Sequence, residues 1–349
     1  MHLFLLFLCV FAMSACGGKE SNEEPMTKTP ITAIAIHGGA GNLKKLNLTK
    51  DEEKAYKEAL SCALSLGDSI LLAGGSSEDA VIAVITFLED SPLFNAGKGA
   101  VFSHDKKNEL DAAIMLGKNL DCGAVTGLYR VKNPIRAAQM VMHKSEHILI
   151  SGTGADQFAE EQGLEMVDPS YFFTAHRWEQ LQEALKEDSI SLDHDGEKQK
   201  PTAGLSNLWD DSKYGTVGCV ALDQQGNLCA GTSTGGLTNK KHGRIGDTPL
   251  IGMGTYANNN SCAVSCTGRG EDFIRATVAY DISARMMYLK EDLKEATRYV
   301  IQDKLKSIKG RGGCIAVDTL GKVSLEFTTT GMFRAYRDGK GDQKVEIYK

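Results

Sequence analysis

Apolar and small residues dominate two neighbouring stretches, residues 216–223 and 228–236. A short turn that contains glycine and asparagine separates them at 224–227. Two such runs around such a turn predict a β-hairpin. Thr216 opens the first run, and taken alone it indicates no function, because β-branched residues are common in strands.

The same analysis predicts strands and helices along the rest of the chain. Strand patterns occur at residues 31–36, 109–115, 122–125, 147–152, 263–266, 314–318 and 322–327. Helical patterns occur at residues 50–73, 77–89, 134–143, 174–186, 271–289 and 292–308. Thr49 and Glu52 form a capping box at the start of the first helix. Strands and helices in this proportion predict an α+β protein in which two sheets lie between helical layers.

Length and composition are those of an ordinary globular protein. The chain has 349 residues, of which 42% are hydrophobic and 24% charged, enough to form a core in one large domain or two. Its formal net charge is −6, so it lacks a basic footprint and we expect no nucleic-acid partner. A small acidic substrate would need a local cationic pocket.

The N-terminus carries a secretion pattern. Residues 2–13 are mainly apolar but too few to span a bilayer as a helix. The small residues after them, followed by Cys16, resemble the processing site of a bacterial lipoprotein. We therefore expect a signal peptide at 1–15, a lipid on Cys16 as the sole membrane contact, and a flexible tether at 16–30. Gly17 is not the aspartate that retains many lipoproteins at the inner membrane, which favours the outer membrane. The alternative is an ordinary secretory signal with Cys16 incidental.

The other cysteines indicate neither a disulfide framework nor a zinc site. Apart from Cys9 and Cys16 they are Cys62, Cys122, Cys219, Cys229, Cys262, Cys266 and Cys314. An odd number at scattered spacings does not suit a set of disulfides. The pair at 262 and 266 lacks a second Cys or His pair nearby, so we do not expect zinc.

Several separated motifs follow Thr216 in order. They are Thr232-Ser233-Thr234-Gly235-Gly236, Gly243-Arg244-Ile245-Gly246-Asp247 and Cys266-Thr267-Gly268-Arg269-Gly270. Two more lie upstream, AIHGGAG at 35–41 and PLFNAGKG at 92–99. Together they resemble the plant-type L-asparaginase/isoaspartyl peptidase family, a branch of the N-terminal nucleophile hydrolases, over nearly everything from Ile31 onward.

This resemblance implies a fold and a processing step. The fold is a four-layer αββα sandwich that forms one hydrolase domain at 31–349. The chain is expected to cut itself between Gly215 and Thr216, which gives fragments 16–215 and 216–349. The polar stretch at 188–208 would let the new chain end move away. We also expect two cleaved αβ units to form a dimer.

The expected chemistry needs a threonine with a free amine. A threonine hydroxyl is a weak nucleophile and requires an adjacent base. The α-amine freed at Thr216 has a reference pKa of about 7.7–8.0, which lies near working pH. The resemblance gives Thr234 the task of tuning this hydroxyl. It gives Thr267 and the Gly268 amide the task of stabilising the oxyanion, worth about 10²–10³ in rate per donor. No cofactor is expected for the chemistry.

A substrate-binding set follows from the same motifs. Arg244 offers a planar fork for a carboxylate, and Asp247 would hold an ammonium group. The whole set implied by the resemblance is Arg244, Ile245, Gly246, Asp247, Thr267, Gly268, Arg269 and Gly270. The alternative for Arg244 and Asp247 is an exposed ion pair three residues apart. The expected partner is a small molecule or dipeptide with an α-amino acid head group.

The loop after the second helix is a candidate sodium site. In the family that the chain resembles, backbone carbonyls of this loop hold a sodium ion, and a hard cation suits such oxygen ligands. The matching positions are Leu88, Glu89, Ser91, Phe94, Ala96 and Lys98. The alternative is a turn that needs no ion.

The expected activity is hydrolysis of β-aspartyl peptides and of L-asparagine. Glycosylasparaginase is the close competitor, because it shares the threonine and the clamp. A lipid-anchored binding protein on the same scaffold would predict loss of one of the three threonines, and none is lost. A serine hydrolase, suggested by Gly231-Thr232-Ser233-Thr234-Gly235, fails because no Asp or Glu stands between this elbow motif and the only downstream histidine, His242.

Overall fold

The computed structural model describes residues 30–44, 47–186 and 215–349. The predicted signal peptide, nearly all of the tether, the lipid site at Cys16 and the polar stretch at 188–208 lie outside the described residues. The domain considered below is Ile31–Lys349. No helix within the described ranges is both long enough and apolar enough to cross a membrane.

The described strands and helices follow one another along the whole domain. The strands are β1 (Ala33–Gly41), β2 (Leu110–Leu116), β3 (Cys122–Leu128), β4 (Leu149–Ser151), β5 (Thr216–Leu222), β6 (Leu228–Thr234), β7 (Thr255–Ala257), β8 (Cys262–Gly268), β9 (Gly312–Asp318), β10 (Val323–Phe327), β11 (Gly331–Arg337) and β12 (Gln343–Tyr348). The α-helices are α1 (Lys50–Leu72), α2 (Ser77–Asp90), α3 (Pro134–Lys144), α4 (Gly152–Glu161), α5 (Ala175–Lys186), α6 (Gly270–Ala276), α7 (Val278–Ala284) and α8 (Leu293–Arg298). Shorter helical segments are η1 (Gly97–Gly99), η2 (Pro169–Phe172), η3 (Arg285–Leu289) and η4 (Tyr299–Leu305).

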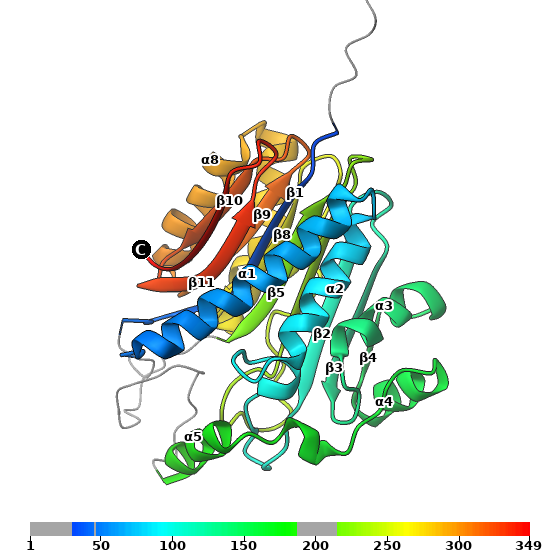
Figure 1. Ribbon diagram of the computed structural model, residues 1–349, viewed down its shortest axis with the longest axis vertical. Coiled ribbons are helices and arrows are strands. Elements are labelled where there is room, and N and C mark those ends of the chain that lie inside the picture. Colours follow the sequence, from blue (N-terminus) through cyan, green and yellow to red (C-terminus); the bar gives the residue numbers. More distant parts are fainter. Residues whose placement is uncertain (1–29, 45–46, 187–214) are drawn as a thin grey trace, which may run out of the picture. The chain divides into compact units, whose positions relative to one another are not determined.

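These strands form two sheets. The larger has eight strands in the order β12-β11-β1-β5-β6-β2-β3-β4, and the smaller has four in the order β10-β9-β8-β7 (Figure 1). Neighbouring strands are antiparallel, except that β3 and β4 are parallel. Strands from both sides of the expected cut alternate in the larger sheet, since β1 pairs with both β11 and β5. Cleavage before β5 would therefore leave the two fragments joined by ladder hydrogen bonds.

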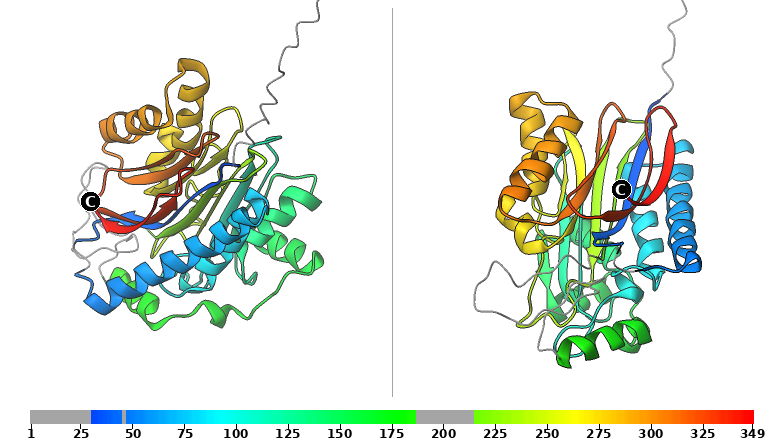
Figure 2. Two further views of the ribbon diagram at one scale, coloured as in Figure 1. Left: turned by 45° about the horizontal axis from the view of Figure 1, so that its top comes forward. Right: turned by 90° about the vertical axis from the view of Figure 1, so that its left-hand side faces the viewer.

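The two sheets pack on each other and each is covered by helices. Ile34 and Ile36 of β1 lie in a core shared with α1 and α2, whereas Ala33 and Ala35 lie in the core between the sheets. This alternation is the period of two of a strand buried on both faces. Helices α7 and α8 cover the smaller sheet, opposite α1 and α2 (Figure 2). The mixed architecture with packed sheets confirms the predicted α+β class.

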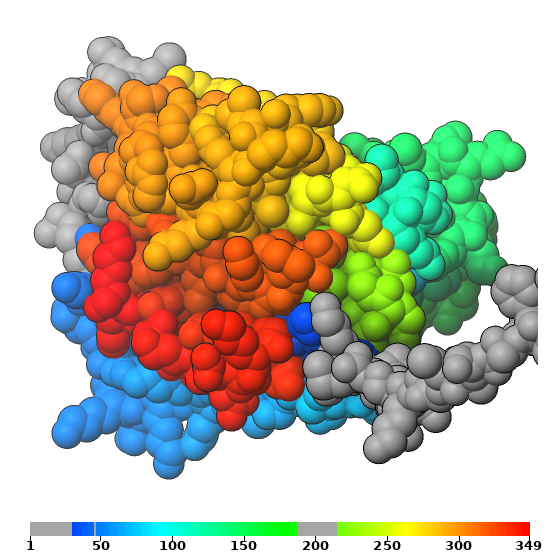
Figure 3. Space-filling view, turned by 90° about the horizontal axis from the view of Figure 1, so that it is seen from above, coloured from blue at the N-terminus to red at the C-terminus, as the bar shows by residue number. Residues whose placement is uncertain are grey.

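The surface shows how closely the two ends of the domain lie. Helix α1 contacts the last strand, β12. Seen from above, the C-terminal strands in red lie beside the blue N-terminal part of the domain, and the orange helices cover the other side (Figure 3). The two ends of the described domain therefore share one region of the fold.

Local signals explain where elements begin. Thr49 Oγ1 accepts a hydrogen bond from the Glu52 amide at 3.2 Å, and the Glu52 carboxylate accepts one from the Thr49 amide at 2.8 Å, as the capping box predicts. The hairpin is also confirmed, with pairing from Thr216–Thr234 to Leu222–Leu228.

Other elements differ from the sequence prediction. The helix predicted at 271–289 is divided into α6, α7 and η3, because Thr277 adopts the left-handed conformation with φ of 51° and interrupts the helical hydrogen bonds. Four elements were not predicted, namely β7, β11, β12 and α4. Strand β7 is only three residues long, and most side chains of the edge strand β12 are at least partly exposed, so neither shows a clear apolar alternation.

Candidate active site

The layer between the two sheets changes from apolar to polar toward one end. Along the inward faces of four strands, alanine, valine and leucine side chains give way to small polar ones. The polar residues are His37 in β1, Thr216 in β5, Thr232 and Thr234 in β6, and Ser265 and Thr267 in β8. All of them are buried. Buried polar groups need hydrogen-bond partners, so this end of the layer has a defined network.

Thr216 and Thr234 meet at the centre of that network. They are direct partners in the β5–β6 ladder, and the Thr216 hydroxyl donates to the Thr234 hydroxyl oxygen at 3.2 Å. Thr234 Oγ1 also accepts from the Gly236 amide at 3.0 Å and donates to the Gly215 carbonyl at 3.2 Å. A single hydroxyl thus contacts both the nucleophile candidate and the carbonyl of the bond expected to break.

Thr267 lies on the facing sheet. Its hydroxyl oxygen accepts a hydrogen bond from the Ala40 amide at 3.3 Å, which leaves its own proton available for another acceptor. The register of β1 against β11 shifts between His37 and Ala40, and this bulge brings the Ala40 amide to Thr267. Gly38 packs its bare Cα against the Phe94 ring, so its small size serves packing in this structure.

A small pocket opens beside these threonines. Its free volume is about 10 Å³, roughly the room of one water molecule. Its walls include Gly215, Thr216, Thr234, Arg244, Asp247 and Gly268. Because Gly215 forms part of the wall, the uncut chain itself fills space at the nucleophile.

Asp247 is a buried carboxylate in this wall. Its side-chain atom Oδ2 has no hydrogen-bond partner. Burial raises the pKa of Asp247 to about 7, although the charge of Arg244 opposes the rise. A buried carboxylate without a partner is costly, and an incoming ammonium group would relieve that cost. Gly254 lies so close to the carboxylate that a side chain there would displace it.

Arg244 reaches the same pocket from the opposite direction. Its Nε and Nη2 donate to the two carboxylate oxygens of Glu271 at 3.0 and 2.9 Å. The guanidinium lies between Gly246 and Gly270, where added Cβ atoms would come within about 3 Å of its nitrogens. The alternative of an exposed pair between Arg244 and Asp247 is wrong. The ion-pair partner of Arg244 is Glu271, and the side chains of Arg244 and Asp247 are largely buried.

The structure distributes the sequence-predicted residues unevenly. Among the substrate-binding set, Arg244, Gly246, Asp247, Gly268 and Gly270 line the pocket. The other three do not line the pocket: Thr267 is buried in β8, Ile245 is half exposed, and Arg269 lies 3.7 Å from Glu271. Glu271 and Asn95 were not predicted as site residues from the sequence, and His37 stood there only within the motif AIHGGAG at 35–41.

The candidate sodium loop is joined to the site through Asn95. The side-chain Nδ2 of Asn95 donates to the Gly236 carbonyl at 2.8 Å, and the backbone carbonyl of Asn95 accepts from the Gly235 amide at 3.1 Å. Movement of this loop would therefore move the turn that follows Thr234. Asn95 also fixes the loop internally by accepting from the Val101 amide at 3.0 Å.

The six predicted sodium ligands lie in one bent segment, from the last turn of α2 to η1. The carbonyls of Leu88, Phe94 and Ala96 each accept one backbone hydrogen bond, which leaves each a second lone pair. Glu89 is fully buried beside them, its Oε2 has no partner, and burial raises its pKa to about 8. Carbonyl oxygens next to a buried carboxyl group suit a hard monovalent cation, so the residues fit the ion.

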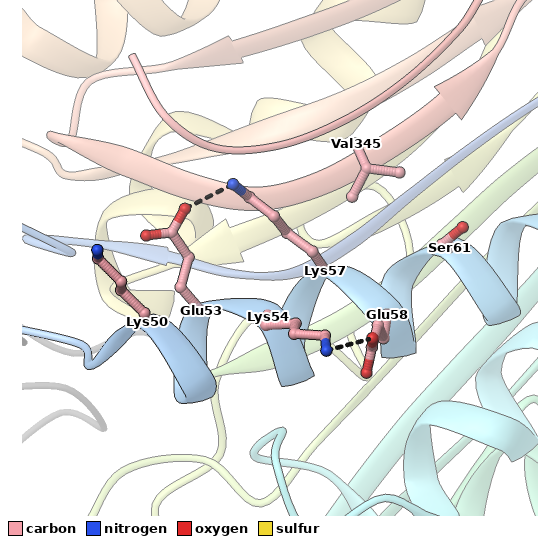
Figure 4. A pocket seen from close by; sticks show the side chains of 7 residues that line it. All are labelled: Lys50, Glu53, Lys54, Lys57, Glu58, Ser61 and Val345. Carbon is pink, nitrogen blue, oxygen red and sulfur yellow. Dashed lines mark hydrogen bonds and ion pairs between the residues drawn. The ribbon is translucent and has the colours of Figure 1, made fainter.

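Another hollow has no such features. It has a volume of about 470 Å³ and lies on the outer face of α1, below Val345 of β12 (Figure 4). Its charged side chains pair along the helix, Lys57 with Glu53 at 2.5 Å and Lys54 with Glu58 at 3.8 Å. Exposed pairs of this kind contribute little and indicate a solvated helix surface.

A buried threonine pair, a facing threonine and a pocket with a carboxylate and a guanidinium are the features of a threonine-nucleophile hydrolase. A family model described as Asparaginase matches residues 30–347, and the chain belongs to this family. The isoaspartyl peptidase of Escherichia coli K12 is 50% identical over 316 residues, which cover 90% of this chain and 96% of that protein. The plant-type L-asparaginase of Pyrococcus horikoshii is 40% identical, over 91% of this chain and 100% of that protein. The isoaspartyl peptidase/L-asparaginase of Bos taurus is 37% identical, over 88% of this chain and 94% of that protein.

Proposed function

We propose that this protein is a self-cleaving threonine amidohydrolase that hydrolyses β-aspartyl peptides and L-asparagine. The observation that carries the proposal is the contact of Thr234 with both the Thr216 hydroxyl and the Gly215 carbonyl, beside Asp247, whose carboxylate oxygen Oδ2 has no hydrogen-bond partner. The names of the relatives above support it. On this proposal the packed sheets and their helices are a four-layer αββα sandwich of the N-terminal nucleophile hydrolase type.

Self-cleavage uses the two threonine hydroxyls. Thr216 Oγ1 attacks the Gly215 carbonyl carbon, while its proton passes to Thr234 Oγ1 and the Thr234 proton moves onto the Gly215 oxygen. The carbonyl re-forms as the C–N bond breaks, and the proton on the Gly215 oxygen passes to the Thr216 nitrogen. The Thr216 amine is now free, and an ester joins Gly215 to the Thr216 side chain. Water hydrolyses this ester, which releases the Gly215 carboxylate and the Thr216 hydroxyl. The amine becomes the base of the mature site.

Turnover repeats the same attack on the substrate. The guanidinium of Arg244 binds the α-carboxylate and the carboxylate of Asp247 binds the α-ammonium group, which presents the side-chain carbonyl to Thr216. Thr216 Oγ1 forms a bond to that carbonyl carbon, and the hydroxyl proton goes to the free α-amine of Thr216 itself. Thr267 and the Gly268 amide stabilise the oxyanion. The leaving amine departs with a proton, and water then hydrolyses the β-aspartyl ester to aspartate.

The head group alone does not choose the leaving group. Glycosylasparagine carries the same α-amino acid end, so glycosylasparaginase remains the competing activity. The test compares kcat/KM for β-Asp-Leu, asparagine and a glycosylated asparagine on protein already cut before Thr216. We expect β-Asp-Leu to be the best of the three and an α-linked Asp-Leu to be refused. If the glycosylated asparagine has the highest kcat/KM, the proposed preference for β-aspartyl peptides is wrong. If none of the three is turned over, the proposed enzymatic activity is wrong.

The sodium ion is proposed as a structural element. The carbonyls of Leu88, Glu89, Ser91, Phe94, Ala96 and Lys98 would hold it. When bound, the ion supplies fixed positive charge that holds the loop in one conformation. Asn95 lies in this loop and ties it to Gly235 and Gly236, so the loop in turn fixes the segment after Thr234.

The lipid anchor and the oligomer are also proposals. We propose that Cys16 carries a lipid and holds the enzyme at the outer membrane of a bacterial envelope, and that two cleaved αβ units associate. The Cys16→Ser variant should move from the membrane fraction to the soluble fraction, and unchanged partition would contradict lipidation. Light scattering on the cleaved domain should give the mass of two units, and the mass of one unit would contradict the dimer.

A further inference from the structure

A line of buried hydrogen bonds starts at the backbone carbonyl of Thr216 and uses side chains that the proposed reaction leaves without a task. His37 Nδ1 lies 2.8 Å from that carbonyl oxygen, and His37 Nε2 lies 2.9 Å from Ser265 Oγ. Ser265 Oγ lies 2.7 Å from Thr232 Oγ1, which lies 2.7 Å from Thr255 Oγ1. All four side chains are fully buried. They come from β1, β8, β6 and β7, so the line crosses from one sheet to the other.

The positions of the protons along this line follow from its ends. A carbonyl oxygen only accepts, so His37 Nδ1 carries the proton of the bond to Thr216. Full burial lowers the pKa of His37 to about 3, so the imidazole is neutral and its Nε2 accepts. The Ser265 hydroxyl therefore donates to Nε2 and accepts from Thr232, and Thr232 accepts from Thr255. Every donor in the line points toward Thr216.

The distances agree with this direction. The opposite orientation would send the Thr232 hydroxyl to the Gly254 carbonyl at 3.4 Å and the Thr255 hydroxyl to the Thr248 carbonyl at 3.2 Å. Hydrogen bonds between a hydroxyl group and an oxygen are usually about 2.7–2.8 Å long. The two hydroxyl–hydroxyl bonds of the line are each 2.7 Å long. The geometry thus selects one tautomer of His37.

Gly218 gives a second, independent indication that the contact is specific. A Cβ atom at Gly218 would overlap both His37 Nε2 and Ser265 Oγ. Residue 218 pairs with His37 in the β1–β5 ladder and lies two residues after Thr216 on the same face of β5. The absence of a side chain there is what lets the imidazole and the hydroxyl meet above the nucleophile strand.

We propose that His37 is a positioning residue that fixes Thr216 once self-cleavage has freed its amino end. This proposal rests on the proposed function. In it, His37 transfers no proton to the substrate. In the uncut chain Thr216 is restrained by its bond to Gly215, and the cut removes that restraint together with the hydrogen bond from Thr234 to the Gly215 carbonyl. The bond from His37 Nδ1 remains, and the line through Ser265, Thr232 and Thr255 keeps the ring in place.

The test compares two substitutions of the same residue. The side-chain amide of asparagine places a nitrogen close to the position of His Nδ1, and that of glutamine places one close to Nε2. His37→Gln should therefore lower kcat for asparagine by about 10- to 100-fold through misplacement of the nucleophile, with KM unchanged. His37→Asn should recover most of kcat, because its amide can still donate to the Thr216 carbonyl.

A matched control separates positioning from loss of stability. Ser261 and Ser283 form another buried hydroxyl pair, 2.6 Å apart, beyond the opposite end of β8 from Thr267. Ser283→Ala should keep the wild-type kcat, whereas Ser265→Ala, which removes the donor to His37, should lower it. If the glutamine variant does not mature, Ser265→Ala carries the test, because it keeps the imidazole, removes its hydroxyl partner and should lower kcat with KM unchanged. An unchanged kcat in Ser265→Ala would then overturn the inference.

Three results would overturn the role proposed for His37 and leave the proposed enzymatic function standing. They are an unchanged kcat in His37→Gln, equal losses of kcat in His37→Gln and His37→Asn, and a change confined to KM. Each result counts only if the thermal unfolding midpoint of the variant equals that of Ser283→Ala. If the wild-type cleaved protein turns over none of its substrates, the proposed function fails instead, so the two failures are distinguishable.

Discussion

The hydroxyl group of Thr216 donates a hydrogen bond to the hydroxyl group of Thr234 across 3.2 Å, and the two residues face each other in one β-ladder. The second hydroxyl also contacts the Gly215 carbonyl at 3.2 Å. Thr234 is thus placed to take a proton from the nucleophile and to give one to the carbonyl that is attacked.

Replacing Thr234 by valine should slow self-cleavage by about 10²-fold or more, because the variant keeps the shape but loses the proton path. Thr234→Ser should restore most of the rate. The fraction of cut chain over time on a denaturing gel measures both. Equal rates for the valine and serine variants would show that the hydroxyl has no part in the step.

Replacing Arg244 by lysine should raise KM for asparagine by about 10- to 100-fold, since a bidentate charged hydrogen bond contributes about 1.5–3 kcal/mol. Self-cleavage should be unaffected, because it uses no substrate carboxylate. Arg275→Lys, at an exposed arginine of α6, the helix that also carries Glu271, is the matched control. An unchanged KM in Arg244→Lys would mean that the guanidinium serves only its ion pair with Glu271.

Binding of L-aspartate to the cleaved enzyme should weaken below about pH 7. The pKa of Asp247 is raised to about 7, so at lower pH this carboxyl group is neutral and loses its attraction for the ligand ammonium. Calorimetry should show the dissociation constant rising by up to about tenfold per pH unit below that value. Asp247→Asn should bind weakly with no such slope. A dissociation constant that is flat from pH 5 to 8 would exclude Asp247 as the ammonium site.

The same carboxylate should cost stability. Its folded pKa lies above its ordinary value of 3.8, so its ionisation disfavours the folded state increasingly as pH rises from about 4 to 7. Asp247→Asn should therefore raise the unfolding midpoint by a few degrees at pH 8 and by less at pH 5, as measured by calorimetry. A larger gain at pH 5 than at pH 8 would contradict an unpartnered, ionised Asp247 in the folded protein.

Sodium should stabilise the domain if the loop at 88–98 binds it. A ligand present at 100 times its dissociation constant adds about 2.7 kcal/mol to the free energy of unfolding. The unfolding midpoint should therefore rise with sodium chloride and remain constant with choline chloride at equal ionic strength. The same midpoint in both salts would leave the loop as an ion-free turn.

Parts of this site follow from the sequence because their signals are local. The hairpin that holds Thr216 and Thr234 appears as two runs of apolar and small residues around a turn. The capping box at Thr49, away from the site, likewise lies within four residues. The partner of Arg244 was not predictable, because Glu271 lies 27 residues away and approaches only through the position of α6. The bond between His37 and Ser265 joins residues 228 apart and requires the two sheets to pack.

One signal for the missed residues does exist in the sequence. On the strand faces that carry Ala33, Val220, Ala230 and Ala263, polar residues or glycine replace the apolar ones two or four positions away, after them in β1, β6 and β8 and before Val220 in β5. That shared change becomes informative only when the strands are aligned in the right register. The division of the helix at Thr277 had no such signal, because threonine is an ordinary residue in a helix and only its tertiary surroundings fix φ at 51°.

The proposed function depends most on Thr216 becoming a chain end. The direct measurement is the intact mass of the purified wild-type protein and of Thr216→Ala, with N-terminal sequencing of the smaller fragment. The wild-type protein should give two fragments, the smaller beginning Thr216-Val217-Gly218, and Thr216→Ala should remain a single chain without activity. A wild-type chain that hydrolyses asparagine while uncut, or a Thr216→Ala chain that still splits before residue 216, would contradict the account.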